Sequence, residues 1–162
     1  MQKFIILINN ENLEILENKD FECFILREEL SSHFKKTFAE AAKQQSKITL
    51  ALSVSDCLAY NLDGVLLDLS KSEHIRRDYK TLTKDLKGKI IGLITRNRRH
   101  ESMLISECEP DFIVFKAWQD GLNKTKELTS WYNEMFLIQS ALWPMEELNF
   151  KDFKTDFIIT PY

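Results

Sequence analysis

Short apolar runs alternate with longer amphipathic stretches along the whole chain, and this alternation constrains the fold more than any other feature of the sequence. The runs are continuous in apolar character, which is typical of parallel strands covered on both faces. The amphipathic stretches between them indicate helices on the outside. Eight runs are candidate strands: residues 4–8, 22–26, 48–52, 64–67, 89–94, 111–115, 136–139 and 156–159.

The stretches between the runs carry helix signals of unequal strength. Four apolar faces have helical spacing: Phe34, Phe38, Ala41 and Ala42; Ile75, Tyr79, Leu82 and Leu86; Leu128, Trp131, Tyr132 and Met135; and Leu148, Phe150 and Phe153. The first of these helices is expected to have Ser31 or Ser32 as its N-cap. The second is expected to begin with a capping box of Ser70 and Glu73 and to stop at Gly88. The last has Pro144 in a first helical position. Residues 10–18 and 53–60 are long enough for about two helical turns each.

Strand and helix alternating eight times predict an α/β fold, a compact (β/α)8 TIM barrel in a single domain of residues 1–162. Such barrels typically take about 250 residues, so the helices of this one are expected to be abbreviated. No stretch follows the last run to form a final helix. An open doubly wound sheet of the flavodoxin type is the alternative, but it usually has about five or six strands.

The expected lack of a final helix has a consequence for assembly. It would leave an apolar flank of the barrel uncovered, and large exposed apolar patches are rare on soluble monomers. We therefore expect a homodimer in which a second copy covers this flank.

Charge and cysteine content exclude several classes of function. The net charge of −3 and the pI near 5.7 give no broad positive field for nucleic acid or for an anionic membrane. Cys23, Cys57 and Cys108 are far apart and never form a CxxC pair, which argues against a disulfide framework or a zinc site. The apolar stretch near the N-terminus is too short for a signal peptide or a membrane span. We expect a cytoplasmic protein with reduced thiols.

Four segments, in matching order and spacing, carry a family resemblance. Residues 25–29 read Ile-Leu-Arg-Glu-Glu, 62–67 read Leu-Asp-Gly-Val-Leu-Leu, 90–94 read Ile-Ile-Gly-Leu-Ile, and 110–115 read Pro-Asp-Phe-Ile-Val-Phe. Together they resemble the thiamine phosphate synthase and thiazole tautomerase family, with its Q-x-R-x-K, A-D-G-V-H-L-G-Q, I-G-x-S-x-H and A-D-Y-[IV]-x-x-G segments. The resemblance implies a TIM barrel in thiamine biosynthesis that binds a phosphorylated ligand. It makes Arg27 a pyrophosphate contact, and Lys124 or Lys126 the lysine of a ligand loop.

Most side chains that do chemistry in that family are replaced in this sequence. The family's magnesium-ligating Asn-Asp aligns with residues 51–52 or 52–53, which carry no carboxylate. Its H-L-G-Q aligns with residues 66–69, which read Leu-Leu-Asp-Leu, and its second metal ligand with Ser70 or Lys71. The phosphate-binding Gly-Gly turn reads Ala-Leu-Trp at residues 141–143. We therefore expect impaired catalysis, with no metal and no cofactor; Mg²⁺ is expected only if the site has been rebuilt.

Polar residues at strand ends are the candidates for a ligand site, because barrel active sites lie at the C-terminal ends of the strands. The residues selected for phosphate binding are Arg27, Arg96, Lys116, Gln139, Asp68 and Lys126. The cations among them could hold an anion by charge-assisted hydrogen bonds. The other interpretation is that each cation pairs with a neighbouring acid or points into water. The basic cluster at residues 96–100 is likewise either an anion site or a solvated loop, and Trp143 either stacks on a ligand or fills the mouth.

Two functions remain in competition at this point. The first is a catalytically impaired relative of thiamine phosphate synthase that binds a small phosphorylated molecule or a protein partner. The second is an active transferase of that type, with Asp68, Glu28 and Lys116 in a rebuilt site.

Overall fold

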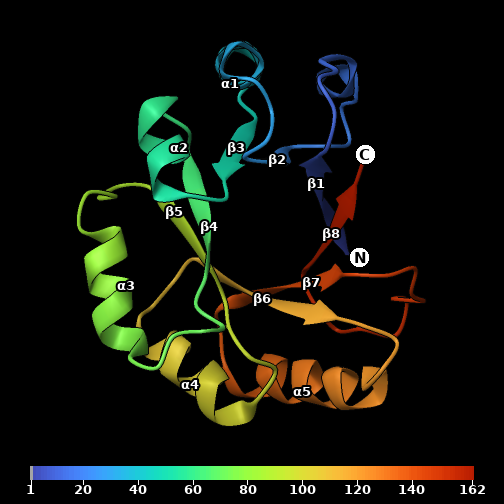
Figure 1. Cartoon of the computed structure of the whole chain (residues 1–162). Coiled ribbons are helices and arrows are strands. Elements are labelled where there is room, and N and C mark those ends of the chain that lie inside the picture. The colour runs from blue at the N-terminus through green and yellow to red at the C-terminus, as the bar shows by residue number, and fades with distance from the viewer. Residues whose placement is uncertain (1) are drawn as a thin grey trace.

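Eight parallel strands pair in chain order, and the last pairs with the first, in a computed structural model that describes residues 2–162 (Figure 1). The predicted (β/α)8 TIM barrel is confirmed, and the open sheet is excluded. Strands β3 and β4 are joined through a register of two residue pairs, as are β7 and β8. The strands are β1 (Lys3–Ile8), β2 (Cys23–Leu26), β3 (Ile48–Ala51), β4 (Gly64–Asp68), β5 (Ile90–Ile94), β6 (Phe112–Ala117), β7 (Gln139–Pro144) and β8 (Phe157–Pro161).

The helices lie outside the strands and are short, as expected (Figure 1). The first connection holds a 3-10 turn and the third a helix of six residues. Within residues 2–162, none of the helices is long and apolar enough to cross a membrane. The helical elements are η1 (Glu14–Glu17), α1 (Ser32–Gln44), α2 (Val54–Ala59), α3 (Ile75–Thr83), α4 (Arg99–Glu107) and α5 (Leu122–Met135).

The predicted helix ends are confirmed at α1 and wrong at α3. Ser31 caps α1, because its hydroxyl accepts a hydrogen bond from the amide of Phe34 at 3.1 Å. The expected capping box of Ser70 does not form. The amide of Ser70 instead donates to Asp68 Oδ1 at 2.9 Å, so Ser70 belongs to the turn that ends β4, and α3 begins at Ile75.

The prediction for the seventh strand and the segment after it was wrong. Residues 136–139 were expected to be the strand, but β7 starts at Gln139 and ends at Pro144. The ring of Phe136 stacks on Tyr132 of α5 at 4.7 Å, so this apolar residue belongs to the outer layer rather than to the sheet. Pro144 pairs with Ala117 of β6 as the last residue of β7, and residues 145–156 form no helix.

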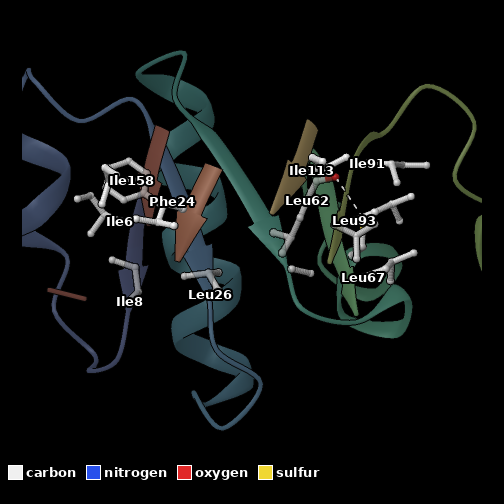
Figure 2. Close-up of a cluster of buried hydrophobic side chains, with 14 of the residues drawn as sticks. Ile6, Ile8, Phe24, Leu26, Leu62, Leu67, Ile91, Leu93, Ile113 and Ile158 are labelled. Atoms are coloured by element: carbon white, nitrogen blue, oxygen red, sulfur yellow. Dashed lines mark hydrogen bonds between the residues drawn. The ribbon is translucent and has the colours of Figure 1, made fainter. Parts of the chain in front are cut away.

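Two apolar layers fill the molecule, and they alternate along every strand. Odd and even neighbours such as Ile5 and Ile6, or Ile25 and Leu26, fall into different clusters. One cluster lies inside the barrel, and the other lies between the strands and the helices. Figure 2 shows the outer cluster, with side chains of β1, β2 and β8 on one side of the barrel and those of β4, β5 and β6 on the other.

The apolar flank that was expected to be uncovered is covered by the chain itself. Ile158 of β8 is fully buried, in one cluster with Leu148 and Phe153 from the irregular segment between β7 and β8. The Gln2 side chain donates to the carbonyl of Phe153 at 2.7 Å, which holds this segment beside the start of β1. The homodimer stays a prediction, but the reason that was given for it no longer holds.

Candidate functional site

The two-residue period of the strands determines which side chains point into the C-terminal mouth of the barrel. Leu7, Ile25, Leu66 and Val114 belong to the inner cluster. The residue two positions after each of these four points to the same side of its strand, and in all four cases it is polar. The mouth is therefore lined by Asn9, Arg27, Asp68 and Lys116, together with Trp143 of the inner cluster and Leu52, which packs against that cluster. On β5 the same step from Ile94 leads to Arg96, which lies on the rim.

Side chains from three strands, β4, β6 and β7, meet in one cluster at this mouth. Lys116 Nζ lies 3.4 Å from Asp68 Oδ2 and 5.3 Å from the centre of the Trp143 ring. Burial alone would raise the pKa of the Asp68 carboxyl. Hydrogen bonds from Ser70 and the charge and hydrogen bond of Lys116 outweigh it and hold that pKa below its ordinary value. Asp68 is therefore an anion at neutral pH.

The Arg27 guanidinium is not part of this pair, and within residues 2–162 it has no acidic partner. Its guanidinium Nε donates to the side-chain oxygen of Asn9, a neutral group. Within residues 2–162, no carboxylate oxygen lies within 4.0 Å of Arg27. The alternative in which Arg27 pairs with Glu28 or Glu29 is therefore not what the structure shows, whereas Lys116 does pair with Asp68.

The basic cluster at residues 96–100 forms a loop and the start of α4, and its side chains contact different partners. Arg96 Nε donates to the carbonyl of Ser70 at 2.8 Å across the rim, and Arg96 is exposed. Asn97 donates to the carbonyl of Lys116 at 2.7 Å. Arg99 lies over the ring of Trp131, 5.0 Å from its centre. This geometry supports a solvated rim rather than a dedicated anion site.

Two of the selected residues lie outside the mouth. Gln139 is the first residue of β7, so it lies at the N-terminal end of the barrel. The misplaced seventh strand explains this, because a residue taken for the end of a strand is in fact its start. Lys126 lies within α5, and its ammonium contacts Asp152 at 3.6 Å. The structure therefore does not bring Gln139 or Lys126 together with Arg27.

Sequence reasoning missed Leu52 as a mouth residue, although a signal was present. Leu50 belongs to the inner cluster, and Leu52 follows it at the two-residue period. Met145 also packs against the inner cluster, to which Trp143 belongs, and Trp143 is 9% exposed. Trp143 therefore lies largely buried in the inner cluster, and only a small part of it can face a ligand at the mouth.

The mouth residues do not fit a magnesium ion. Mg²⁺ prefers octahedral oxygen ligands, usually one or two carboxylates with substrate phosphates. Asp68 is the one carboxylate in the ring of inward side chains, and Ser70 and Lys116 already hold it. Within residues 2–162, no three His, Cys, Asp or Glu side chains are grouped to hold a metal. The arrangement of two cations, an amide and an indole ring suits an organic anion instead.

Comparison with known sequences finds no family model and no curated protein that matches this chain. Solved structures do match it. Orotidine 5'-monophosphate decarboxylase from Methanocaldococcus jannaschii, complexed with inhibitor BMP, matches with a TM-score of 0.69 at 16% identity. The match covers 99% of this chain and 89% of the decarboxylase chain. The 3-keto-L-gulonate-6-phosphate decarboxylase of Vibrio cholerae O1 has a TM-score of 0.62 at 10% identity, with coverage of 99% and 88%. The HpcH/HpaI aldolase of Desulfitobacterium hafniense has a TM-score of 0.60 at 10% identity, with coverage of 99% and 86%.

These neighbours overturn the resemblance to thiamine phosphate synthase, because they are TIM barrels of other families. The glycines that carried the resemblance have a packing role. A Cβ atom on Gly64 would lie 2.2 Å from the carbonyl oxygen of Ile90, and one on Gly92 would lie 2.3 Å from the Phe112 ring. Close packing between strands requires glycine there in any barrel with this geometry. The comparisons therefore show a TIM-barrel fold of the kind found in these enzymes.

Proposed function

We propose that this chain binds a small phosphorylated molecule across the C-terminal mouth, with the phosphate on Arg27 and the other end of the ligand against Lys116 and Trp143. The observation that carries the proposal is the Arg27 guanidinium, which Asn9 orients and no carboxylate neutralises within residues 2–162. A guanidinium presents a planar set of donors that matches phosphate geometry, so Arg27 is suited to a bidentate contact.

The opposite side of the mouth supports the second half of the proposal. The contact between Lys116 and Asp68 is 3.4 Å long, whereas strong charge-assisted hydrogen bonds measure about 2.7–2.9 Å. The ammonium is thus loosely held and can turn to an anionic or carbonyl oxygen of a ligand at low cost. Beside it lies the Trp143 ring, 5.3 Å from Lys116 Nζ, whose small exposed part can contact a planar ring of the ligand.

The names of two structural neighbours are in keeping with this ligand class. Orotidine 5'-monophosphate and 3-keto-L-gulonate-6-phosphate are both phosphorylated compounds. The identities of 16% and 10% limit that similarity to the fold, so the proposal rests on the mouth residues of this chain and not on these names.

The proposed role is binding without efficient turnover. General acid–base catalysis needs a titratable group within hydrogen-bond reach of the reacting atoms. The three histidines, His33, His74 and His100, lie in α1, beside α3 and in α4, and none lies on a strand. Asp68 and Lys116 are the remaining titratable groups of the mouth, and they face each other at 3.4 Å, so the ionised Asp68 carboxylate is a poor proton donor.

Calorimetric titration with a graded set of probes tests this function. Inorganic phosphate, ribose 5-phosphate and uridine 5'-monophosphate add first a sugar and then a planar base to the same phosphate. We expect affinity to rise along this series. Arg27→Gln should weaken uridine 5'-monophosphate binding about tenfold or more, because hydrogen bonds to charged groups contribute about 1.5–3 kcal/mol.

The matched control is Arg77→Gln, which makes the same change on exposed α3. It should leave all three affinities unchanged. The proposal fails if the folded wild-type protein binds none of the probes, or if Arg77→Gln weakens binding as much as Arg27→Gln does. Release of carbon dioxide from orotidine 5'-monophosphate at an enzymatic rate would contradict the part of the proposal that concerns turnover.

A further inference from the structure

The barrel interior is open at the end opposite to the candidate site. A cavity of about 970 Å³ lies there, lined by residues at or just before the starts of the strands. This volume is at the upper end of the range of about 300–1,000 Å³ that is typical of small-molecule sites. The lining residues that the argument uses are Ile5, Cys23, Ile48, Leu50, Phe112 and Gln139.

One large inward side chain of the cavity wall, Phe112, packs closely against the backbone of β5. Phe112 of β6 pairs in register with Gly92 of β5. Three atoms of its ring lie within 2.3–2.7 Å of the position that a Cβ of Gly92 would occupy. The ring therefore fills the space that a side chain on β5 would take, and Phe112 forms part of the cavity wall.

The deep part of the cavity is lined by apolar side chains, whereas charged and amide side chains line its opening. Ile5, Leu50 and Phe112 form the deep wall, and Ile48 remains 37% exposed at the opening. Cys23 adds a thiol to this wall. Burial, and to a smaller extent the charge of Asp63, raises the pKa of the thiol to about 12, so it is uncharged at neutral pH. An apolar wall of this kind favours a ligand that can be desolvated without loss of hydrogen bonds.

The rim of the cavity does not select a charged head group. Lys3 and Lys19 lie on it together with Asp20, Glu22 and Asp111. Two cations and three carboxylates thus lie on the rim, so it carries no excess of positive charge. Gln139 also lies on the rim and is exposed, and within residues 2–162 its side-chain amide makes no hydrogen bond. One amide on an apolar rim can accept or donate a single hydrogen bond.

We infer that this N-terminal cavity is a second ligand site, which binds an uncharged, largely apolar small molecule with one hydrogen-bonding group, such as an alcohol, ketone or ester. The apolar part of the ligand lies against Ile48, Leu50 and Phe112, and its polar group meets Gln139. The site is independent of the phosphate site, which occupies the other end of the barrel.

Titration calorimetry with 1-octanol and with octanoate tests this site. We expect 1-octanol to bind more tightly than octanoate, because the rim has no excess positive charge. Ile48→Trp fills the opening and should weaken 1-octanol binding by about tenfold or more, since the burial of several methylene groups is lost. Gln139→Leu should weaken it about threefold to tenfold through the loss of one hydrogen bond.

The matched control is Leu58→Trp, which places the same indole on exposed α2, where Leu58 is 46% exposed. It should not change 1-octanol binding. Cys23→Leu provides a smaller filling of the same cavity if Ile48→Trp does not fold. No 1-octanol binding by folded wild-type protein, or equal effects of Leu58→Trp and Ile48→Trp, would overturn the inference. Tighter binding of octanoate would overturn the neutral ligand class. Arg27→Gln should leave 1-octanol binding intact, which separates this result from the outcome for the phosphate site.

Discussion

Lys116 Nζ lies 3.4 Å from Asp68 Oδ2, and this contact joins β6 to β4 across the C-terminal mouth of the barrel. The other carboxylate oxygen of Asp68 accepts a hydrogen bond from the amide of Ser70 at 2.9 Å. The side chain of Asp68 is 46% exposed and that of Lys116 is 28% exposed, so water and salt screen the pair. The geometry is thus that of a loosely held pair at a surface, suited to exchanging partners with a ligand.

Asp68→Asn should lower the free energy of unfolding at pH 7 by roughly 0.2–1 kcal/mol, the range for exposed ion pairs. The pKa of Asp68 is lower in the folded chain than its ordinary value of 3.8. Its contribution is therefore fully present above pH 3.8, and it is lost as the pH falls through the folded pKa. Urea unfolding of both proteins between pH 7 and pH 2 measures the difference. A difference that persists at pH 2 would show that the charge of Asp68 is not its cause.

A more deeply buried pair lies outside the barrel, between α1 and α2. Lys35 Nζ lies 2.8 Å from Asp56 Oδ2 and 2.7 Å from the carbonyl oxygen of Glu28. The side chains are 6% and 17% exposed. Asp56→Ala should cost about 3–5 kcal/mol of stability, because it leaves a buried ammonium without its counter-ion.

The double variant Lys35→Met/Asp56→Leu replaces both partners of this pair by apolar side chains. Replacing a buried ion pair by packed apolar side chains is often neutral or stabilising. We expect the double variant to recover most of the stability that Asp56→Ala loses, as measured by urea unfolding at pH 7. If the double variant is less stable than Asp56→Ala, the ion pair itself contributes net stability and this expectation is wrong.

The barrel was predictable because its main evidence is local. Continuous apolar runs such as residues 4–8 and 89–94 are buried on both faces in any parallel barrel, whatever lies beside them. The N-cap of α1 was equally local, since Ser31 bonds to Phe34, three residues away. The position of the seventh strand could not be inferred from local evidence in this way. Phe136 and Ile138 have the character of strand residues, but they pack from outside against the core.

The candidate site was predictable only where strand ends were placed correctly. The positions of Arg27, Asp68 and Lys116 in the mouth could be anticipated because the predicted ends of β2, β4 and β6 fall within two residues of the observed ones. Gln139 does not lie in the mouth, because β7 begins rather than ends there. The pairing of Lys35 with Asp56 joins residues 21 positions apart on two helices, and no sequence period connects them. The packing of the Phe112 ring against β5 depends on register between strands, which a single sequence does not reveal.

Gly92→Ala should destabilise the protein because its new methyl group would enter the space of the Phe112 ring, 2.3 Å from the nearest ring atom. Overpacking of this kind typically costs about 1–3 kcal/mol. Phe112→Leu should offset part of that loss in the double variant, because the smaller side chain can withdraw. Gly64→Ala is the contrasting change, since its methyl would meet the backbone oxygen of Ile90 at 2.2 Å. Phe112→Leu should give it no rescue, and equal rescue of both variants would refute this account.

The burial of Tyr132 can be tested by measuring the stability of the protein at alkaline pH. Its ring is fully buried, and its hydroxyl forms a hydrogen bond of 2.8 Å with Ser106. Burial raises the pKa of this phenol above its ordinary value of 10.0, and the bond with Ser106 opposes the shift. The unfolded chain therefore loses this proton at a lower pH than the folded chain does, so stability falls as the pH rises above 10.0.

Tyr132→Phe should cost about 0.5–1.5 kcal/mol at pH 7, the usual contribution of one hydrogen bond. The cost stays in this range because Ser106 still donates to the carbonyl of Ser102 at 2.7 Å. Above pH 10.0 the variant should lose stability less steeply than the wild type, since it lacks the titrating phenol. Guanidinium unfolding at pH 7, 9, 10.5 and 11.5 gives both curves, and the other raised groups, Tyr79 and the three thiols, act equally on each. If the two curves stay parallel throughout, Tyr132 does not titrate differently in the folded and unfolded chains, and its burial does not oppose ionisation in the way that we infer.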